Sequence, residues 1–359
     1  MQSSKDSSQF HHVLITGITG YIGFKTLLLA LEKGYRVRGA VRNSRNISEL
    51  LSKSPFLRQG QEQGQLDFAV IPDFFNLESW VKELDSIRTV IHLASPLAIE
   101  CDDYETGIIE PAISMVTTVL EAAARASTVK RVIITSSCVT LVPFEWNMNP
   151  DTERIYTAAD SNRNPTRPFG SAMEAYWASK ALARKATRTF VDERKPGFDF
   201  INLLPSVVIG PDDRIQSDGG VAPLLKGTRA AVLAPALDAS TNSSFPYPGA
   251  PVHVADVAKA HVDAIDADRI PGNSEFILSS DTPDGIEWDR DIKYVAQEFF
   301  PDEVVDGSLP MKGSLPTIRW RLDGQTTEVA FGWKFRSFMD TMHDLIVQYL
   351  HLKVNTPSL

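Results

Sequence analysis

The chain has 359 residues, of which 43% are hydrophobic, and its formal net charge at pH 7 is -9. This length suits one large α/β domain, alone or with a smaller lobe, and the acidic balance argues against nucleic acid or anionic membranes as partners. No run approaches the roughly 18 consecutive apolar residues of a membrane span, and the low cysteine content is typical of a reducing compartment, so we expect a cytoplasmic protein without disulfides.

The order of predicted elements follows one pattern over the first two hundred residues. Residues 1–10 are polar and are predicted to be a flexible tail. Strands are then predicted at 12–16, 35–41, 67–71, 89–94, 131–135, 200–204 and 275–279, with the clearest helices at 21–33, 108–126 and 171–193. Nearly continuous apolar strands that alternate with amphipathic helices predict an α/β fold with a doubly wound parallel (Rossmann) sheet.

The regular alternation ends after Pro205, where Pro and Gly become frequent as far as Pro251. We therefore expect a first domain over residues 11–205, completed by about 253–280. Residues 206–252 and 281–359 are predicted to form a smaller C-terminal lobe.

A glycine-rich turn joins the first strand to the first helix, in the segment from Thr16 to Gly23. Gly17, Gly20 and Gly23 can serve a tight turn, a close approach of backbone to a pyrophosphate, and close packing of helix on strand. The N-terminus of the helix would face the phosphates. The spacing is G-x-x-G-x-x-G rather than G-x-G-x-x-G, but its position between strand and helix predicts dinucleotide binding.

The end of the second strand indicates which dinucleotide is bound. A site that prefers NAD usually has a carboxylate there, which accepts hydrogen bonds from the ribose hydroxyls. Here Arg42 follows the strand, with Arg45 nearby, and no acid occurs before Glu49. A guanidinium suits a 2′-phosphate, so NADP(H) is favoured.

Tyr176 and Lys180 place a phenol and an ammonium one helical turn apart. A nearby cation favours the phenolate and would lower the pKa of the tyrosine toward the range needed for proton transfer. The same spacing occurs at Tyr21/Lys25 and at Tyr349/Lys353, so the pair is informative only through its context.

That context is a strand which ends in hydroxyl residues before the helix of Tyr176. The strand ends of a doubly wound sheet face the ligand, so Ser137 is expected to hydrogen-bond the substrate oxygen, with Ser136 as the alternative. Tyr176 would act as the general acid. Lys180 would lower the pKa of Tyr176 and bind the nicotinamide ribose.

Together these features resemble the extended short-chain dehydrogenase/reductase superfamily. Its dihydroflavonol reductase-like branch, which includes cinnamoyl-CoA reductases and yeast and fungal aldehyde and ketone reductases, is similar at several segments. These are VIHLASP at 90–96, PAI at 111–113, VLEAA at 119–123, RVIITSS at 131–137 and LPSVVIGP at 204–211. The resemblance covers roughly residues 12–265 and fades in the C-terminal lobe.

The resemblance implies a role for individual residues. Arg42 matches the family's 2′-phosphate arginine, Asp73 and Phe74 match its adenine-contacting pair, and residues 205–208 would line the nicotinamide pocket. The expected cofactor-binding set is Gly17, Thr19, Gly20, Tyr21, Ile22, Gly23, Arg42, Asp73, Phe74, Ala94, Lys180, Pro205, Val207 and Val208.

One departure from the superfamily concerns the proton relay. Many extended members carry an asparagine on the fourth helix that holds a relay water, whereas residues 112–115 here read AISM. Ser114, water alone, or the Lys180 ribose contact would have to replace it.

Two other groups of residues have weaker functional interpretations. His253, Asp256 and His261 could be metal ligands, but a strand followed by a helix start explains them better, so no metal is predicted. Aromatic residues between Ser137 and Tyr176 could wall the pocket of a bulky carbonyl substrate or could simply pack in the loop: Phe144, Trp146, Phe169 and Trp177.

The sequence therefore predicts an NADPH-dependent reductase of a ketone or aldehyde, working as a monomer or homodimer. The substrate would enter between the nicotinamide and the C-terminal lobe. Three alternatives stay open: a non-catalytic NADP(H) sensor, a sugar-nucleotide epimerase or dehydratase, and a hydroxysteroid dehydrogenase. Intact Ser137, Tyr176 and Lys180 argue against the sensor, and the missing acid after the second strand argues against the epimerase.

Overall fold

The computed structural model describes residues 11–243 and 245–354, so the predicted tail lies outside the described residues. The chain divides into two compact units. Unit 1 comprises Met1–Glu145, Ala158–Leu204 and Ala258–Phe276, and unit 2 comprises Trp146–Thr157, Pro205–Val257 and Ile277–Leu359. The segment Trp146–Thr157 thus belongs with the second unit and not, as the sequence predicted, with the first.

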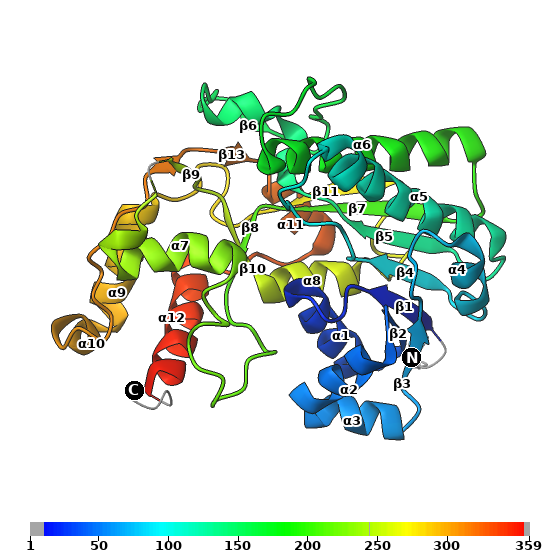
Figure 1. Ribbon diagram of the computed structural model, residues 1–359, viewed down its shortest axis with the longest axis horizontal. Coiled ribbons are helices and arrows are strands. Elements are labelled where there is room, and N and C mark those ends of the chain that lie inside the picture. Colours follow the sequence, from blue (N-terminus) through cyan, green and yellow to red (C-terminus); the bar gives the residue numbers. More distant parts are fainter. Residues whose placement is uncertain (1–10, 244, 355–359) are drawn as a thin grey trace, which may run out of the picture. The chain divides into compact units, whose positions relative to one another are not determined.

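A seven-stranded sheet forms the centre of unit 1, and its strands can be followed in Figure 1. Its order is β11-β7-β5-β4-β1-β2-β3, so the chain winds outward from β1 in both directions. The strands are β1 His12–Thr16, β2 Arg36–Val41, β3 Leu66–Val70, β4 Thr89–His92, β5 Arg131–Thr135, β7 Asp199–Pro205 and β11 Ser274–Leu278.

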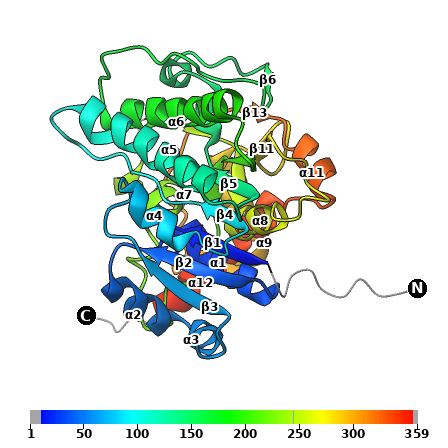
Figure 2. The same ribbon diagram turned by 90° about the vertical axis from the view of Figure 1, so that its right-hand side faces the viewer.

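Helices cover both faces of this sheet. Figure 2 shows α4, α5 and α6 on one side and α1 and α3 on the other. The bounds are α1 Tyr21–Glu32, α2 Ser44–Lys53, α3 Pro55–Glu62, α4 Leu77–Glu83, α5 Glu110–Arg125, α6 Ala172–Arg194 and, across the boundary of the units, α8 Val254–Asp263. This arrangement is the doubly wound α/β fold that the sequence predicted.

The apolar periodicity of the sequence explains the packing of unit 1. Leu14, Val90 and Val132, from three adjacent strands, are fully buried against Val119 and Leu120 of α5. Adjacent strands of the central part pair in parallel, with Ile15 opposite Gly39 on one side and Ile91 on the other. The point at which strand order reverses therefore lies between β1 and β4, where such folds bind ligands.

Unit 2 consists of short strand pairs and helices around its own core. Trp288, Ile292, Met342 and Leu345 are among the buried residues of that core. Parallel pairs form between β8 Val207–Ile209 and β10 Pro251–His253, between β9 Tyr247–Pro248 and β12 Thr317–Ile318, and between β6 Ile155–Tyr156 and β13 Arg321–Leu322. The helices are α7 Gly227–Leu237, α9 Trp288–Phe299, α10 Pro301–Val305, α11 Gln325–Phe331 and α12 Phe338–Val354.

One helical stretch of the described chain, Glu105–Arg125, is long and apolar enough to cross a membrane by length and composition alone. It joins a π-helical turn, Glu105–Ile109, to α5. Its apolar face packs in the core of unit 1, where Val119 and Leu120 are fully buried. This stretch therefore contributes part of its apolar surface to the core of unit 1.

Candidate functional site

The glycine turn after β1 is packed closely against neighbouring backbone. Gly17 has φ +70°, and a Cβ there would lie 2.9 Å from the backbone nitrogen of Ala94, just beyond β4. A Cβ on Gly23 would lie 2.1 Å from the carbonyl oxygen of Gly17. Gly20 is the N-cap of α1 and provides no side-chain cap among the described residues, so the first turn of the helix presents backbone N–H groups.

The end of β4 is fixed to the end of β1 by a single hydroxyl. Thr16 Oγ1 accepts hydrogen bonds from the backbone nitrogens of Leu93 (3.0 Å) and Ala94 (2.9 Å) and lies 3.1 Å from His92 Nδ1. Because the oxygen accepts twice, its own proton is donated to His92, whose Nδ1 must be unprotonated. Burial, together with the charge of Lys180, lowers the pKa of His92 to about 3, which keeps the ring neutral.

Arg42 lies directly after β2, and its side chain is exposed. Within the described part of the chain it forms no ion pair, whereas Arg45 pairs with Glu49 at 2.9 Å on α2. Arg42 is therefore available to a ligand phosphate, and Arg45 already has a carboxylate partner.

The predicted adenine-contacting pair, Asp73 and Phe74, lies in the turn after β3. The Phe74 ring is buried and packs edge-on against Trp80, with 5.1 Å between the ring centres. Asp73 is exposed, and its Oδ1 accepts from the backbone of Phe75 at 2.8 Å. The adenine contact of this pair stays a prediction.

Tyr176 and Lys180 lie on successive turns of α6. The helix begins at a cap in which Ser171 Oγ accepts from Glu174 N, while the Glu174 carboxylate accepts from Gly170 N, one residue before the cap. The Lys180 ammonium lies 5.8 Å from the centre of the Tyr176 ring. The arrangement places the phenol early in the helix.

The same distance recurs on α12, where Lys353 lies 6.0 Å from the Tyr349 ring. Spacing alone therefore does not distinguish the two pairs. Burial does, because the Lys180 side chain is buried, whereas Lys353 is exposed.

Burial shifts the pKa values of both Tyr176 and Lys180, and for the tyrosine the direction is opposite to the one predicted. It raises the pKa of Tyr176 to about 12, and it lowers the pKa of Lys180 to about 8. The sequence predicted that the lysine would lower the tyrosine pKa, but desolvation of the phenolate dominates here. Tyr176 is thus a neutral phenol at pH 7.

Ser137 and Ser136 differ in their access to a ligand. Ser137 is partly exposed and caps the short 3-10 helix Cys138–Leu141, with its Oγ accepting from Val139 N at 3.3 Å. Ser136 Oγ is shielded from solvent and has no hydrogen-bond partner in the described chain. It borders a cavity of about 30 Å³, which also touches Lys180 and Asn202 and is only large enough for water. Ser137 is therefore the more accessible hydroxyl.

The other predicted residues are spread over both units. Phe144 and Trp177 pack edge-on at 5.4 Å in unit 1, and Phe169 borders a small cavity beside them. Trp146 belongs to unit 2, where its ring centre lies 4.9 Å from that of Trp320 at a tilt of 38°. Three predicted cofactor-binding residues also lie in unit 2: Pro205, Val207 and Val208. Val207 and Val208 are the first two residues of β8.

The candidate metal ligands have ordinary protein partners. Asp256, in the first turn of α8, pairs with Arg336 at 2.7 Å, and His261 lies 2.7 Å from Thr135 Oγ1. His253 ends β10 and accepts from Ala255 N. No group of three or more potential ligands that could hold a metal gathers anywhere in residues 11–243 or 245–354.

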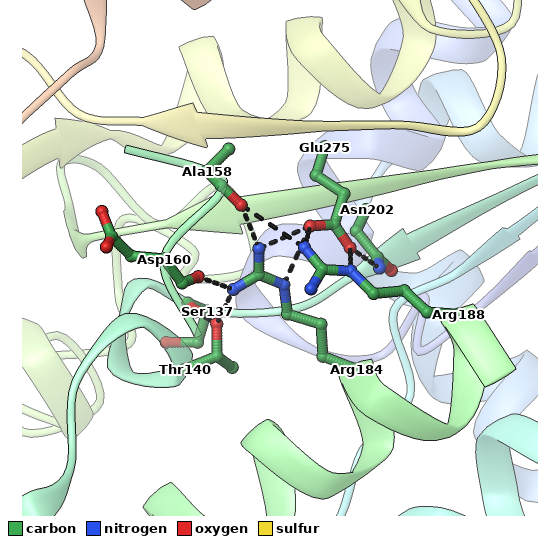
Figure 3. A network of polar contacts seen from close by, with 8 residues as sticks. All are labelled: Ser137, Thr140, Ala158, Asp160, Arg184, Arg188, Asn202 and Glu275. Carbon is green, nitrogen blue, oxygen red and sulfur yellow. Dashed lines mark hydrogen bonds and ion pairs between the residues drawn. The ribbon is translucent and has the colours of Figure 1, made fainter. Parts of the chain in front are cut away.

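Sequence reasoning missed a polar network beneath the Ser137 turn, shown in Figure 3. Its centre is Arg184, four residues after Lys180 on α6, and its partners include Thr140 and Glu275. The position of Arg184 in the series 176, 180, 184 was a signal, because residues four apart share one helix face.

Comparison with known proteins identifies the family. The model of the NAD-dependent epimerase/dehydratase family matches residues 13–277. The chain belongs to this family. The ketoreductase CTB6 of Cercospora nicotianae is 31% identical over 354 residues, which cover 95% of each protein.

Solved structures of the superfamily share the fold. The yeast methylglyoxal/isovaleraldehyde reductase Gre2, solved with NADPH, has a TM-score of 0.77 at 24% identity and covers 96% of this chain and 99% of its own. Vestitone reductase from alfalfa has a TM-score of 0.68 at 24% identity, with the same coverage. The family match and the 31% identical ketoreductase relative confirm the predicted membership of the extended short-chain dehydrogenase/reductase superfamily, and the chain is an oxidoreductase of that superfamily.

Proposed function

We propose that the protein is an NADPH-dependent reductase that transfers a hydride to the carbonyl carbon of a ketone or aldehyde. The observation that carries this proposal is the pair on α6, in which the Lys180 side chain is buried and Tyr176 is partly exposed. Tyr176 is held as a neutral phenol beside the buried ammonium of Lys180, 5.8 Å from the centre of its ring. A phenol that retains its proton at pH 7 is the form needed to protonate a carbonyl oxygen.

Several features support NADPH as the cofactor. The glycine turn leaves a close approach to the backbone at Gly17, and the exposed Arg42 can pair with a 2′-phosphate. NADPH supplies the hydride when it is bound. We assign its binding to Gly17, Thr19, Gly20, Tyr21, Ile22, Gly23, Arg42, Asp73, the backbone of Phe74, Ala94, Lys180, Pro205, Val207 and Val208.

The proposed roles at the carbonyl follow from accessibility and protonation. Ser137 and Tyr176 hydrogen-bond the carbonyl oxygen, and Tyr176 donates its proton to that oxygen as negative charge develops there. The Lys180 ammonium stabilises the phenolate that remains.

The family model also includes epimerases and dehydratases, which is the main competing activity. Enzymes of that kind usually hold NAD tightly, and the second strand here is followed by Arg42 rather than by an acid. We therefore favour a reductase, which takes up and releases NADPH in each cycle.

The decisive assay is absorbance at 340 nm with NADPH, and then NADH, across a panel of aromatic and aliphatic ketones and aldehydes. We expect oxidation of NADPH that depends on the carbonyl. Tyr176→Phe should lower kcat at least about 100-fold and leave the Kd for NADPH within about 2-fold of wild type. Tyr349→Phe is the matched control, because it removes the hydroxyl of the corresponding pair on α12. Normal turnover by Tyr176→Phe would exclude the mechanism.

A further inference from the structure

Arg184 is the most completely buried charged side chain near the proposed site. It lies on α6 one turn after Lys180 and two turns after Tyr176, and its side chain is 0% exposed. A buried guanidinium is unfavourable unless its donors are paired. The hydrogen-bond partners of its guanidinium therefore show which segments of unit 1 this side chain connects.

Each end of the Arg184 fork reaches a different part of unit 1 (Figure 3). Nε donates to Glu275 of β11 at 3.1 Å. Nη1 donates to Thr140 Oγ1 and to the carbonyl of Asp160, both at 2.9 Å, and Nη2 donates to the carbonyl of Ala158. One side chain of α6 thus binds a strand, a loop and the turn after Ser137.

Glu275 balances this buried charge. Burial opposes its ionisation, but hydrogen bonds from Arg184 and Arg188 give the carboxyl a pKa below its usual value. Asn202 Nδ2 also donates to it, at 2.7 Å. The carboxylate is therefore ionised at neutral pH, and Arg184 stays fixed between it and Thr140.

Thr140 connects the guanidinium to Ser137. Its fully buried hydroxyl accepts from Arg184 and donates to the carbonyl oxygen of Ser137 at 2.8 Å. The backbone nitrogen of Thr140 donates to the same oxygen at 3.1 Å. The backbone of Ser137 is thereby tied, through one hydroxyl, to the helix that carries Tyr176 and Lys180.

We propose that Arg184 is a positioning residue for carbonyl reduction, which sets Ser137 relative to Tyr176 through the hydroxyl of Thr140. This inference rests on the proposed function, because Ser137 must bind the substrate oxygen for its position to matter. Arg184 itself touches no reacting atom. A misplacement of about 1 Å in such a group is enough to slow a reaction about 100-fold.

Thr140→Val tests the link directly. The substitution keeps the shape of the side chain and the Arg184–Glu275 pair but removes the hydroxyl between Arg184 and Ser137. We expect kcat for the best carbonyl substrate to fall about 10- to 100-fold, with the Kd for NADPH within about 2-fold of wild type. Thr140→Ser, which restores the hydroxyl, should recover most of the rate.

Two further variants separate positioning from stability. Thr341→Val removes another fully buried hydroxyl, one that donates at 2.8 Å to the carbonyl of Ser337, and should leave kcat unchanged. Arg184→Lys keeps a charge beside Glu275 but lacks the fork that reaches Thr140. It should show the same loss of kcat, and it serves as the test if Thr140→Val does not fold.

A double-mutant cycle with Ser137→Ala distinguishes positioning of Ser137 from a purely structural role, because it compares the kcat of the single variants with that of the double variant. If Arg184 acts through Ser137, Thr140→Val should lower kcat no further in the Ser137→Ala background. Unchanged kcat in Thr140→Val and Arg184→Lys, or losses that multiply fully with Ser137→Ala, would overturn the positioning role alone. Wild-type activity in Ser137→Ala, or no carbonyl-dependent oxidation by the wild type, would overturn the proposed function and this inference together.

Discussion

Protonation of the two groups on α6, Tyr176 and Lys180, depends more on burial than on the nearest charge. Burial favours the neutral form of each group: it raises the pKa of Tyr176 to about 12 and lowers the pKa of Lys180 to about 8. A cation one turn away suggested a more acidic phenol, but a sequence does not show how much water a site excludes. The lysine is consequently the group of this pair that titrates near neutral pH.

The pH dependence of reduction should report Lys180. Its ammonium is present below about pH 8 and is lost above it, so we expect kcat/KM to be level below that pH and to fall above it. Lys180→Arg, which stays charged, should move the decline to higher pH at whatever rate it retains. A wild-type profile that is level to pH 10 would contradict this assignment.

Unfolding should not account for that decline. Because the pKa of Lys180 is lowered from 10.5 to about 8, the unfolded chain binds more protons than the folded chain between these values. The contribution of Lys180 to stability therefore rises with pH over this window. Circular dichroism at pH 9 serves as the control.

Arg42 should decide the choice between the two nicotinamide cofactors. Arg42→Ala removes a charged hydrogen bond, so we expect the KM for NADPH to rise about 10- to 100-fold while that for NADH stays within about 2-fold. Arg36→Ala is the matched control, since Arg36 lies on the same strand but pairs with Asp67. Equal changes in both KM values would rule out a 2′-phosphate contact.

At the scale of elements, most of unit 1 could be predicted because its strands are apolar and its helices periodic. The predicted strands 12–16 and 131–135 match β1 and β5, and the other predicted strands of the sheet shift by one or two residues at their ends. The Arg184–Glu275 pair could not be predicted, because its residues are 91 positions apart and no periodicity links them. Trp146–Thr157 was misassigned for a related reason: its strand β6 pairs with the remote β13.

The turn between β1 and α1 permits a sharp test of packing. Gly23→Ala would place a Cβ 2.1 Å from the Gly17 carbonyl oxygen, so the helix must move away from the turn. We expect loss of NADPH binding in fluorescence titrations and a lower Tm. Gly197→Ala, where a Cβ meets nothing within 4 Å, should leave both unchanged. Normal NADPH affinity in Gly23→Ala would mean that the turn is not the pyrophosphate site.

For the molecule as a whole, buried histidines should limit stability in acid. Burial lowers the pKa of His12 to about 4 and that of His92 to about 3, from 6.5. Between these values the unfolded chain binds more protons, so stability falls as pH decreases from 6.5 to 4, by on the order of 1 kcal/mol per pKa unit for a buried group.

Urea unfolding at pH 6.5 and pH 4.5 measures this loss. In His92→Asn, whose amide oxygen can still accept from Thr16, the difference between the two pH values should be smaller than in the wild type. Identical differences would show that His92 does not bind its proton on unfolding.

The order in which the ribosome makes the chain gives the Arg184 network another consequence. Glu275 follows Arg184 by 91 residues, which takes on the order of 5 to 20 s at the usual rate of synthesis. Until then the guanidinium lacks the carboxylate that makes its burial favourable. We therefore expect α6 to reach its final packing only late in translation, with its apolar face open to chaperones in the meantime.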